Sequence, residues 1–204
     1  MAFPSVYEMT NPLTTVRKQH FWEYFSGATL NSRWTRFFSG GTAGMHDSVN
    51  GGYQMSGSAV NEGIWFNDIN QYAHNGSVMV FASYGTYTTR SKAIGGLGDN
   101  SNTTLTTINK ASIHHDTASG VVGQTADGSS ETATAMTGSN LQDGVLGTYK
   151  IETKSSSVEF SDSGVIKATN TTNLPTAKME PVFIMSSVTG ASTMGVVYVE
   201  CYNT

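Results

Sequence analysis

The sequence contains little charge and almost no cysteine, and each shortage excludes a class of protein. Only 13% of the 204 residues are charged, with 11 basic against 15 acidic side chains. Binding to nucleic acid requires a basic surface that neutralises phosphates, so we expect no nucleic-acid partner. The single cysteine, Cys201, excludes an internal disulfide and a cysteine-based zinc cluster. Apolar runs stay far below 18 residues, so we expect no membrane span, and the first residues lack the pattern of a secretory signal.

Leu, Glu, Lys and Arg are also scarce, which argues against a mainly helical chain. Val, Ile and Thr together outnumber those four by about two to one. Branched side chains favour strands, whereas unbranched ones favour helices. The composition therefore predicts an all-β protein with a surface rich in Ser, Thr and Gly.

Turn signals recur at short intervals from Phe21 onward, and the segments between them alternate as strands do. The segment from Tyr149 to Lys154 alternates apolar or small residues with charged ones, which is typical of a half-exposed strand. The predicted turns are Asn50-Gly51-Gly52, Asn75-Gly76-Ser77, Asp127-Gly128, Asp143-Gly144 and Asp162-Ser163-Gly164. We predict a two-sheet antiparallel jelly-roll sandwich. Its predicted core contains Trp34, Phe81, Ile151, Phe160, Phe183, Val197 and Val199, with Cys201 buried beside the last two.

The chain divides into two parts. Residues 1–20 contain two prolines and no clean period, so we predict an extended N-terminal arm, with a short edge strand as the alternative. Residues 21–204 form the jelly-roll domain. The arm carries apolar side chains that we expect to dock on a neighbouring subunit, so we expect a homo-oligomer or larger assembly: Phe3, Val6, Tyr7, Met9 and Leu13.

Residues 91–140 are polar and contain weaker strand candidates. LTTINK, ASIHHD, GVVGQT and ETATAM have small side chains, as expected for strands whose face lines a groove.

Four segments resemble the concanavalin A-like lectin/glucanase superfamily. They are FWEYFSGATLNSRWT near the start, NGGYQM, the late unit from YKIETK to KMEPVF, and the final strand VVYVECY. The resemblance covers roughly residues 21–204 and implies a jelly-roll fold. The superfamily includes lectins, glycoside hydrolases and non-catalytic virion components, so the resemblance alone leaves the function open.

Glucanases on this fold carry a strand of the form Glu-x-Asp-x-Glu or Glu-x-Asp-x-x-Glu, which this sequence lacks. Its closest acidic pairs are Glu62/Asp68, Glu152/Glu159 and Glu159/Asp162. Glu152 and Glu159 are expected on different strands, and Asp162 in a turn. We therefore predict no enzymatic activity and no hydrolysis of β-glucans.

The candidate binding residues are aromatic and polar. Trp65, Tyr84, Tyr87 and His114 could contact a glycan, although each could equally be structural. His114 and His115 are adjacent on a strand and should point to opposite faces, one inward and one exposed, so they are not expected to share a metal. Asp99, Asn100 and Asn102 form a weak calcium candidate, which could instead be an ordinary loop, and no other cofactor is expected.

Three functions follow from these observations. The first is a non-catalytic structural or decorating protein of a virion, made in the cytoplasm and able to bind cell-surface glycans. The second is a soluble carbohydrate-binding lectin module. The third is a glycoside hydrolase with an unrecognised site.

Overall fold

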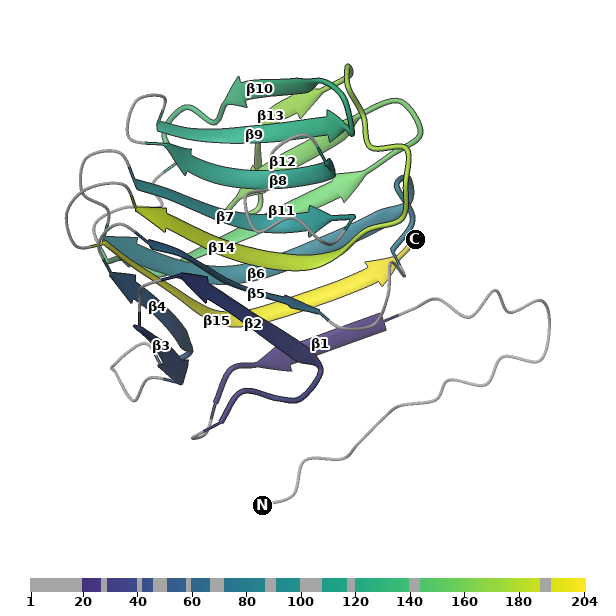
Figure 1. Cartoon of the computed structure of the whole chain (residues 1–204). Coiled ribbons are helices and arrows are strands. Elements are labelled where there is room, and N and C mark those ends of the chain that lie inside the picture. The colour runs from purple at the N-terminus through teal and green to yellow at the C-terminus, as the bar shows by residue number, and fades with distance from the viewer. Residues whose placement is uncertain are drawn as a thin grey trace.

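The described part of the chain is a sandwich of two antiparallel β-sheets (Figure 1). The computed structural model describes residues 20–26, 29–39, 42–45, 51–57, 60–66, 72–86, 91–99, 108–116, 120–139, 144–187 and 192–204. Every regular element in these ranges is a strand, and they contain no helix that could span a membrane. The predicted all-β jelly roll is therefore confirmed.

The eight-stranded sheet has β6 and β15 at its centre. In spatial order it contains β13 (Val165–Asn170), β12 (Val158–Asp162), β11 (Gly147–Thr153), β6 (Ser77–Thr86), β15 (Ser192–Asn203), β4 (Tyr53–Gly57) and β3 (Thr42–Met45). The remaining strand, β1 (His20–Tyr24), pairs with the C-terminal half of β15, whereas β4 pairs with its N-terminal half.

The seven-stranded sheet covers the other side of the core. In spatial order it contains β10 (Glu131–Ala135), β9 (Gly120–Asp127), β8 (Asn109–Asp116), β7 (Ser91–Gly98), β14 (Glu180–Ser187), β5 (Val60–Phe66) and β2 (Trp34–Ser39). The strands predicted at ASIHHD, GVVGQT and ETATAM are β8, β9 and β10. Of LTTINK, only Asn109 and Lys110 join a strand, and its first three residues lie outside the described ranges.

Turn residues end the strands where the sequence predicts. β12 and β13 form a hairpin whose turn places Ser163 at φ 51° and Gly164 at φ 80°. Two consecutive positive φ values match the twist of a hairpin, which is why a two-residue turn connects these strands. β3 and β4 also pair, as predicted on either side of the Asn50-Gly51-Gly52 signal.

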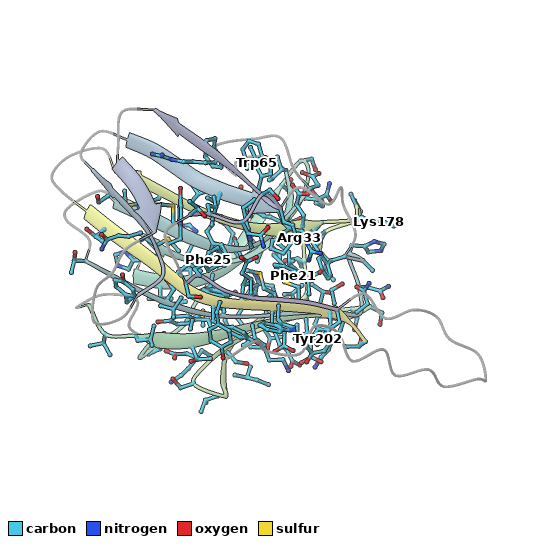
Figure 2. All side chains as sticks on the ribbon, turned by 90° about the horizontal axis from the view of Figure 1, so that it is seen from below. Phe21, Phe25, Arg33, Trp65, Lys178 and Tyr202 are labelled. Atoms are coloured by element: carbon cyan, nitrogen blue, oxygen red, sulfur yellow. The ribbon has the colours of Figure 1, made fainter. Side chains whose placement is uncertain are left out.

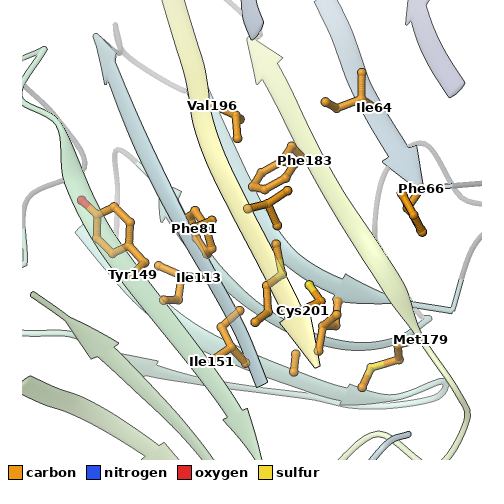
Figure 3. Close-up of a cluster of buried hydrophobic side chains, with 14 of the residues drawn as sticks. Ile64, Phe66, Phe81, Ile113, Tyr149, Ile151, Met179, Phe183, Val196 and Cys201 are labelled. Carbon is orange, nitrogen blue, oxygen red and sulfur yellow. The ribbon is translucent and has the colours of Figure 1, made fainter. Parts of the chain in front are cut away.

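The core lies between the sheets and combines aromatic with aliphatic side chains and methionines (Figure 3). Phe81 of β6 and Phe183 of β14 meet across the sandwich with ring centroids 5.4 Å apart. Gly95 of β7 faces the same space, since a Cβ there would lie 2.8 Å from the Phe81 ring. Of the predicted core residues, Trp34, Phe81, Ile151, Phe160, Phe183, Val199 and Cys201 are buried.

The exception is Val197, which is only half-buried. The register of β15 on β6 shifts here, because Val196 pairs with Ser83 and Tyr198 with the next residue, Ala82. Val197 is the extra residue of a β-bulge, so strict alternation fails at this point. Val196 takes the inward position instead and is fully buried.

The arm predicted for residues 1–20 lies outside the described residues, apart from its last member. His20 is the first residue of β1, so the strand begins one residue earlier than the predicted domain. The predicted assembly contacts Phe3, Val6, Tyr7, Met9 and Leu13 all lie outside the described residues.

Candidate functional site

Strand pairing brings polar side chains together on the outer face of the seven-stranded sheet. On β8, Ala111 and Ile113 point into the core, so the alternating residues Lys110, Ser112 and His114 face outward. On β9, Gly123 faces the core, since a Cβ there would meet the Phe160 ring at 2.3 Å. Its neighbours on either side, including Gln124, therefore share the outer face with the β8 side chains.

A chain of hydrogen bonds links three of these residues, Lys110, Gln124 and His114, through Glu131 of β10. Lys110 Nζ donates to Glu131 Oε1 at 2.6 Å, and Gln124 Nε2 donates to Glu131 Oε2 at 2.7 Å. The Gln124 carbonyl lies 3.1 Å from His114 Nδ1. An amide oxygen can only accept, so His114 Nδ1 carries a proton and donates it. The network therefore holds the Glu131 carboxylate through two donors and sets the orientation of the His114 ring.

Glu131 itself is positioned by the turn before it. Asp127 Oδ1 accepts hydrogen bonds from the backbone N–H groups of Ser130 at 2.9 Å and Ser129 at 2.8 Å. These bonds lower the pKa of Asp127 below its usual value, because they stabilise the charged carboxylate. The turn delivers the chain into β10 at Glu131, its first residue.

A second carboxylate lies on the same face, on β14. Glu180 pairs with Gly98 of β7, and Gly98 pairs with Lys110 of β8. Gly98 has no side chain, so no side chain of β7 lies between Glu180 and Lys110 in this row. Glu180 is 1% exposed, and Lys110 is 3% exposed, whereas the Glu131 side chain is 34% exposed. Lys110 is thus placed between a buried and a partly exposed carboxylate.

The other end of this face is apolar. Trp65 of β5 stacks on Phe37 of β2 with centroids 4.7 Å apart and an interplanar angle of 24°. Both pack against Val182 and Ile184 of β14, as does Ile108 before β8. Trp65 remains only half-buried, so an aromatic ring reaches solvent on the same face as Glu131.

The structure places two of the four predicted glycan contacts on one face of the sandwich. Trp65 and His114 lie on the outer face of the seven-stranded sheet. Tyr84 lies on β6 in the other sheet, where its hydroxyl donates to the Gly51 carbonyl at 3.1 Å. Its ring covers Gly195, at which a Cβ would come within 2.2 Å. Tyr84 therefore does not join Trp65 and His114, and Tyr87 lies outside the described residues.

The two histidines point to opposite faces, as predicted. His115 faces the core and is fully buried. We expected the other histidine to be exposed, which is wrong, because His114 is also buried within the polar network.

Of the three calcium candidates, the structure describes only Asp99. Its Oδ2 accepts hydrogen bonds from the backbone and side-chain nitrogens of Asn109, at 3.2 and 2.9 Å. This contact joins the end of β7 to the start of β8. Asn100 and Asn102 lie outside the described residues, and the described residues contain no group of His, Cys, Asp and Glu that could hold a metal ion.

The acidic pair Glu152/Glu159 lies on the eight-stranded sheet. As expected, the two residues come from different strands and face each other across β11 and β12. Each forms its own ion pair, Glu152 with Lys150 and Glu159 with Lys154, both at 2.6 Å. The hydrogen bond from Lys150 lowers the pKa of Glu152. Sequence reasoning missed Glu131 and Glu180, since they come from strands far apart in the chain and only the strand order aligns them.

Comparisons with known proteins show that glucanases share the fold of this chain. A β-glucanase of Bacillus licheniformis superposes with a TM-score of 0.64 at 13% identity, covering 91% of this chain and 98% of the glucanase. The chain has the glucanase fold. A β-1,3-1,4-glucanase (lichenase) from a mouse hindgut metagenome gives 0.66 at 11% identity, with 90% and 98% covered. A pseudo β-1,3-glucanase of Mycobacterium tuberculosis gives 0.63 at 10% identity, with 90% and 98% covered.

No protein-family model matches the chain, and no curated protein matches it. The structural likeness at these identities establishes the fold and transfers no catalytic residue. The resemblance is confirmed at the level of the jelly-roll fold, which the glucanases share, and the virion subtype is not shown.

These matches overturn two predictions from the sequence. We predicted a structural component of a virion and no enzymatic activity, whereas proteins that share the fold are named as glucanases and a transglycosylase. Both predictions are wrong. Low charge and abundant Thr, Ser and Gly describe the surface of many β-sandwiches and do not identify a particle. The absence of the acidic strand does not exclude hydrolysis, because the carboxylates of a site can come from separate strands.

Proposed function

We propose that the protein binds an oligosaccharide or polysaccharide along the outer face of the seven-stranded sheet. The observation that carries the proposal is the combination of Trp65 and the Lys110–Glu131–Gln124–His114 network on one face. The similarity to the β-glucanases supports it, since those proteins are named for carbohydrate substrates.

Each end of the face suits one part of a sugar. A pyranose presents an apolar C–H face, which packs on an aromatic ring, and hydroxyl edges, which need polar partners. Trp65 supplies the ring, and Glu131 supplies acceptors whose orientation Lys110 and Gln124 fix. A bound chain need not move these groups, so little entropy is lost at the protein.

The distance across the face indicates a chain of several sugars. Trp65 lies on β5 and Glu131 on β10, which are separated in the sheet by β14, β7, β8 and β9. Five interstrand spacings correspond to about 24 Å. A ligand that contacts both residues is therefore an oligosaccharide rather than a single sugar.

Hydrolysis of the bound glycan is a second candidate function, and the fold shared with the glucanases favours it. Glycoside hydrolases act through two carboxyl groups about 5–10 Å apart. Glu180 of β14 and Glu131 of β10 are four interstrand spacings apart, or about 19 Å, so they do not form such a pair and each is tested separately.

The experiment is a screen of soluble glycans, including mixed-linkage β-glucan, followed by titration of the best binder. We expect Trp65→Ala and Glu131→Gln each to weaken binding about tenfold or more, equivalent to about 1.4 kcal/mol. Glu152→Gln is the matched control, because Glu152 is also partly exposed and paired with lysine, but on the other sheet. Release of reducing ends by the wild type and Glu152→Gln, but not by Glu131→Gln or not by Glu180→Gln, would establish hydrolysis. Equal binding by the wild type, Trp65→Ala, Glu131→Gln and Glu152→Gln would refute the proposal.

A further inference from the structure

A second group of aromatic side chains lies on the opposite sheet, outside the site described above. Phe21 of β1 points into the core, so the alternating residues His20, Trp22 and Tyr24 face outward. Trp22 is 55% exposed and Tyr24 is 60% exposed. Large aromatic surfaces left in water are a sign of a binding surface when they occur together.

The bulge at Val197 adds β15 side chains to this group. Beyond the bulge, Val199 and Cys201 are buried, so Tyr198, Glu200 and Tyr202 face outward. Antiparallel pairing then sets each beside a residue of β1, in the pairs His20–Tyr202, Trp22–Glu200 and Tyr24–Tyr198. We refer to these six residues as the β1/β15 patch.

The aromatic rings of the patch are in mutual contact. The Tyr24 and Tyr198 centroids lie 4.7 Å apart, and those of Trp22 and Tyr24 lie 6.1 Å apart. The rings restrict one another, so a ligand that packs on them meets a surface with few conformations left to lose.

A fixed carboxylate lies within the patch. Glu200 Oε2 accepts from the Tyr198 hydroxyl at 2.7 Å, and Glu200 Oε1 lies 2.8 Å from His20 Nε2. Burial and this hydrogen bond raise the pKa of the Tyr198 hydroxyl, which therefore stays a neutral donor. The patch thus combines exposed ring faces with oriented hydrogen-bonding groups.

We propose that the β1/β15 patch is a second carbohydrate-binding surface, on the opposite side of the sandwich from the candidate site. Figure 2 places Tyr202 and Trp65 on opposite sides of the molecule, with Phe21 between them. Trp22 and Tyr24 would pack on the C–H faces of sugars. The remaining lone pairs of Glu200 would accept from sugar hydroxyls, and the tyrosine hydroxyls of the patch would also form hydrogen bonds with them.

The size of the patch favours a sugar over a protein. Stable protein interfaces bury about 800 Å² and 20–30 residues on each side. The patch has six residues, and beyond Val80 of β6 the same face carries the ion pairs Lys150–Glu152 and Lys154–Glu159. Charged pairs of this kind are depleted in the centre of protein interfaces. The aromatic area is therefore bounded by charge and matches a few sugar units.

The test uses the full chain carrying Trp65→Ala, so that the candidate site is weakened, and a panel of soluble glucans, xylan, mannan and chitin oligosaccharides. Binding is followed by calorimetry. We expect at least one glycan to bind, and the further change Trp22→Ala to weaken that binding tenfold or more. Trp22→Phe keeps an aromatic face and should stay within about threefold of its parent. Val165→Ala, at an equally exposed apolar residue of β13, is the matched control and should change nothing.

Two results would overturn the proposal. One is that no glycan of the panel binds the Trp65→Ala protein at millimolar concentration. The other is that Trp22→Ala has no more effect than Val165→Ala. Gel filtration of the wild type and Trp22→Ala tests the protein alternative, because a dimer that dissociates in the variant would identify the patch as a contact between copies. A glycan that binds the Trp65→Ala protein and is lost in Trp22→Ala would support the β1/β15 patch independently of the function proposed for the other sheet.

Discussion

Cys201 shows how a residue with reactive chemistry becomes inert through its position. It lies on β15 and is fully buried in the core between the sheets (Figure 3). Burial raises the pKa of its thiol well above the usual value, and the nearby charge of Glu200 acts in the same direction. The thiolate is the reactive form, so the folded state suppresses the nucleophile both by access and by protonation.

We therefore predict that Cys201 reacts with thiol reagents only when the protein unfolds. The raised pKa means that the neutral thiol persists in the folded state as the pH rises past the unfolded value. The free energy of unfolding is therefore unaffected by this group below the unfolded pKa and falls as the pH rises from there through the higher folded pKa, because the unfolded state loses the proton first. The measurement is the labelling rate at pH 8 with and without urea. Labelling of the native protein as fast as a free thiol would contradict this.

At the scale of elements, Asn170 at the end of β13 ties the two sheets together. Its Nδ2 donates to the carbonyls of Gly123 and Thr132 at 3.2 and 3.1 Å, and its Oδ1 accepts from Thr134 Oγ1 at 2.6 Å. These partners belong to β9 and β10 in the opposite sheet, and Asn170 is 1% exposed. The amide therefore adds buried hydrogen bonds between the sheets to the backbone pairing within each sheet.

We predict that Asn170→Ala lowers the free energy of unfolding by about 1–3 kcal/mol, because it removes the hydrogen bonds between the sheets and the Asn170 acceptor of the Thr134 hydroxyl. Thr169→Ala, at the exposed neighbour on β13, is the control and should change stability by less than about 0.5 kcal/mol. Urea denaturation measures both. Equal midpoints would show that the inter-sheet contact contributes nothing.

Asn170→Asp gives the same contact a pH dependence. The charged form of the introduced carboxyl group would face two carbonyl oxygens, so its folded pKa lies above the unfolded value. The variant should then approach the wild type below the unfolded pKa and lose stability as the pH rises through the folded pKa.

Across the whole molecule, local signals predicted the elements, but only the fold could show which of them meet. The turn at Ser163-Gly164 and the alternation of β11 are local, so the hairpins and most core residues were predictable. The pairing of β10 with β9 and of β14 with β7 decides that Glu131 and Glu180 share a face, and no local pattern encodes that register. The sequence also does not predict the bulge at Val197, since Val196, Val197 and Val199 are the same residue type.

The two proposed surfaces lie on opposite sheets with the core between them. Sites this far apart with no shared partner behave independently. For a short oligosaccharide that binds both, we predict two sites per chain in the wild type and one in either Trp65→Ala or Trp22→Ala. Calorimetric stoichiometry measures this. A single site in the wild type would contradict the arrangement.

The bulge in β15 also affects which changes in chain length this strand can accept. Removing one residue from a strand ordinarily turns every later side chain to the wrong face. Here Val196 and Tyr198 already pair with consecutive residues of β6, so deletion of Val197 would leave a regular ladder with Val199 and Cys201 still inward. The deletion would remove one local contact, the hydrogen bond from the Phe25 backbone N–H to the Val197 carbonyl at 3.0 Å. Chains of this fold that differ by one residue at this position could therefore keep the same core and the same β1/β15 patch.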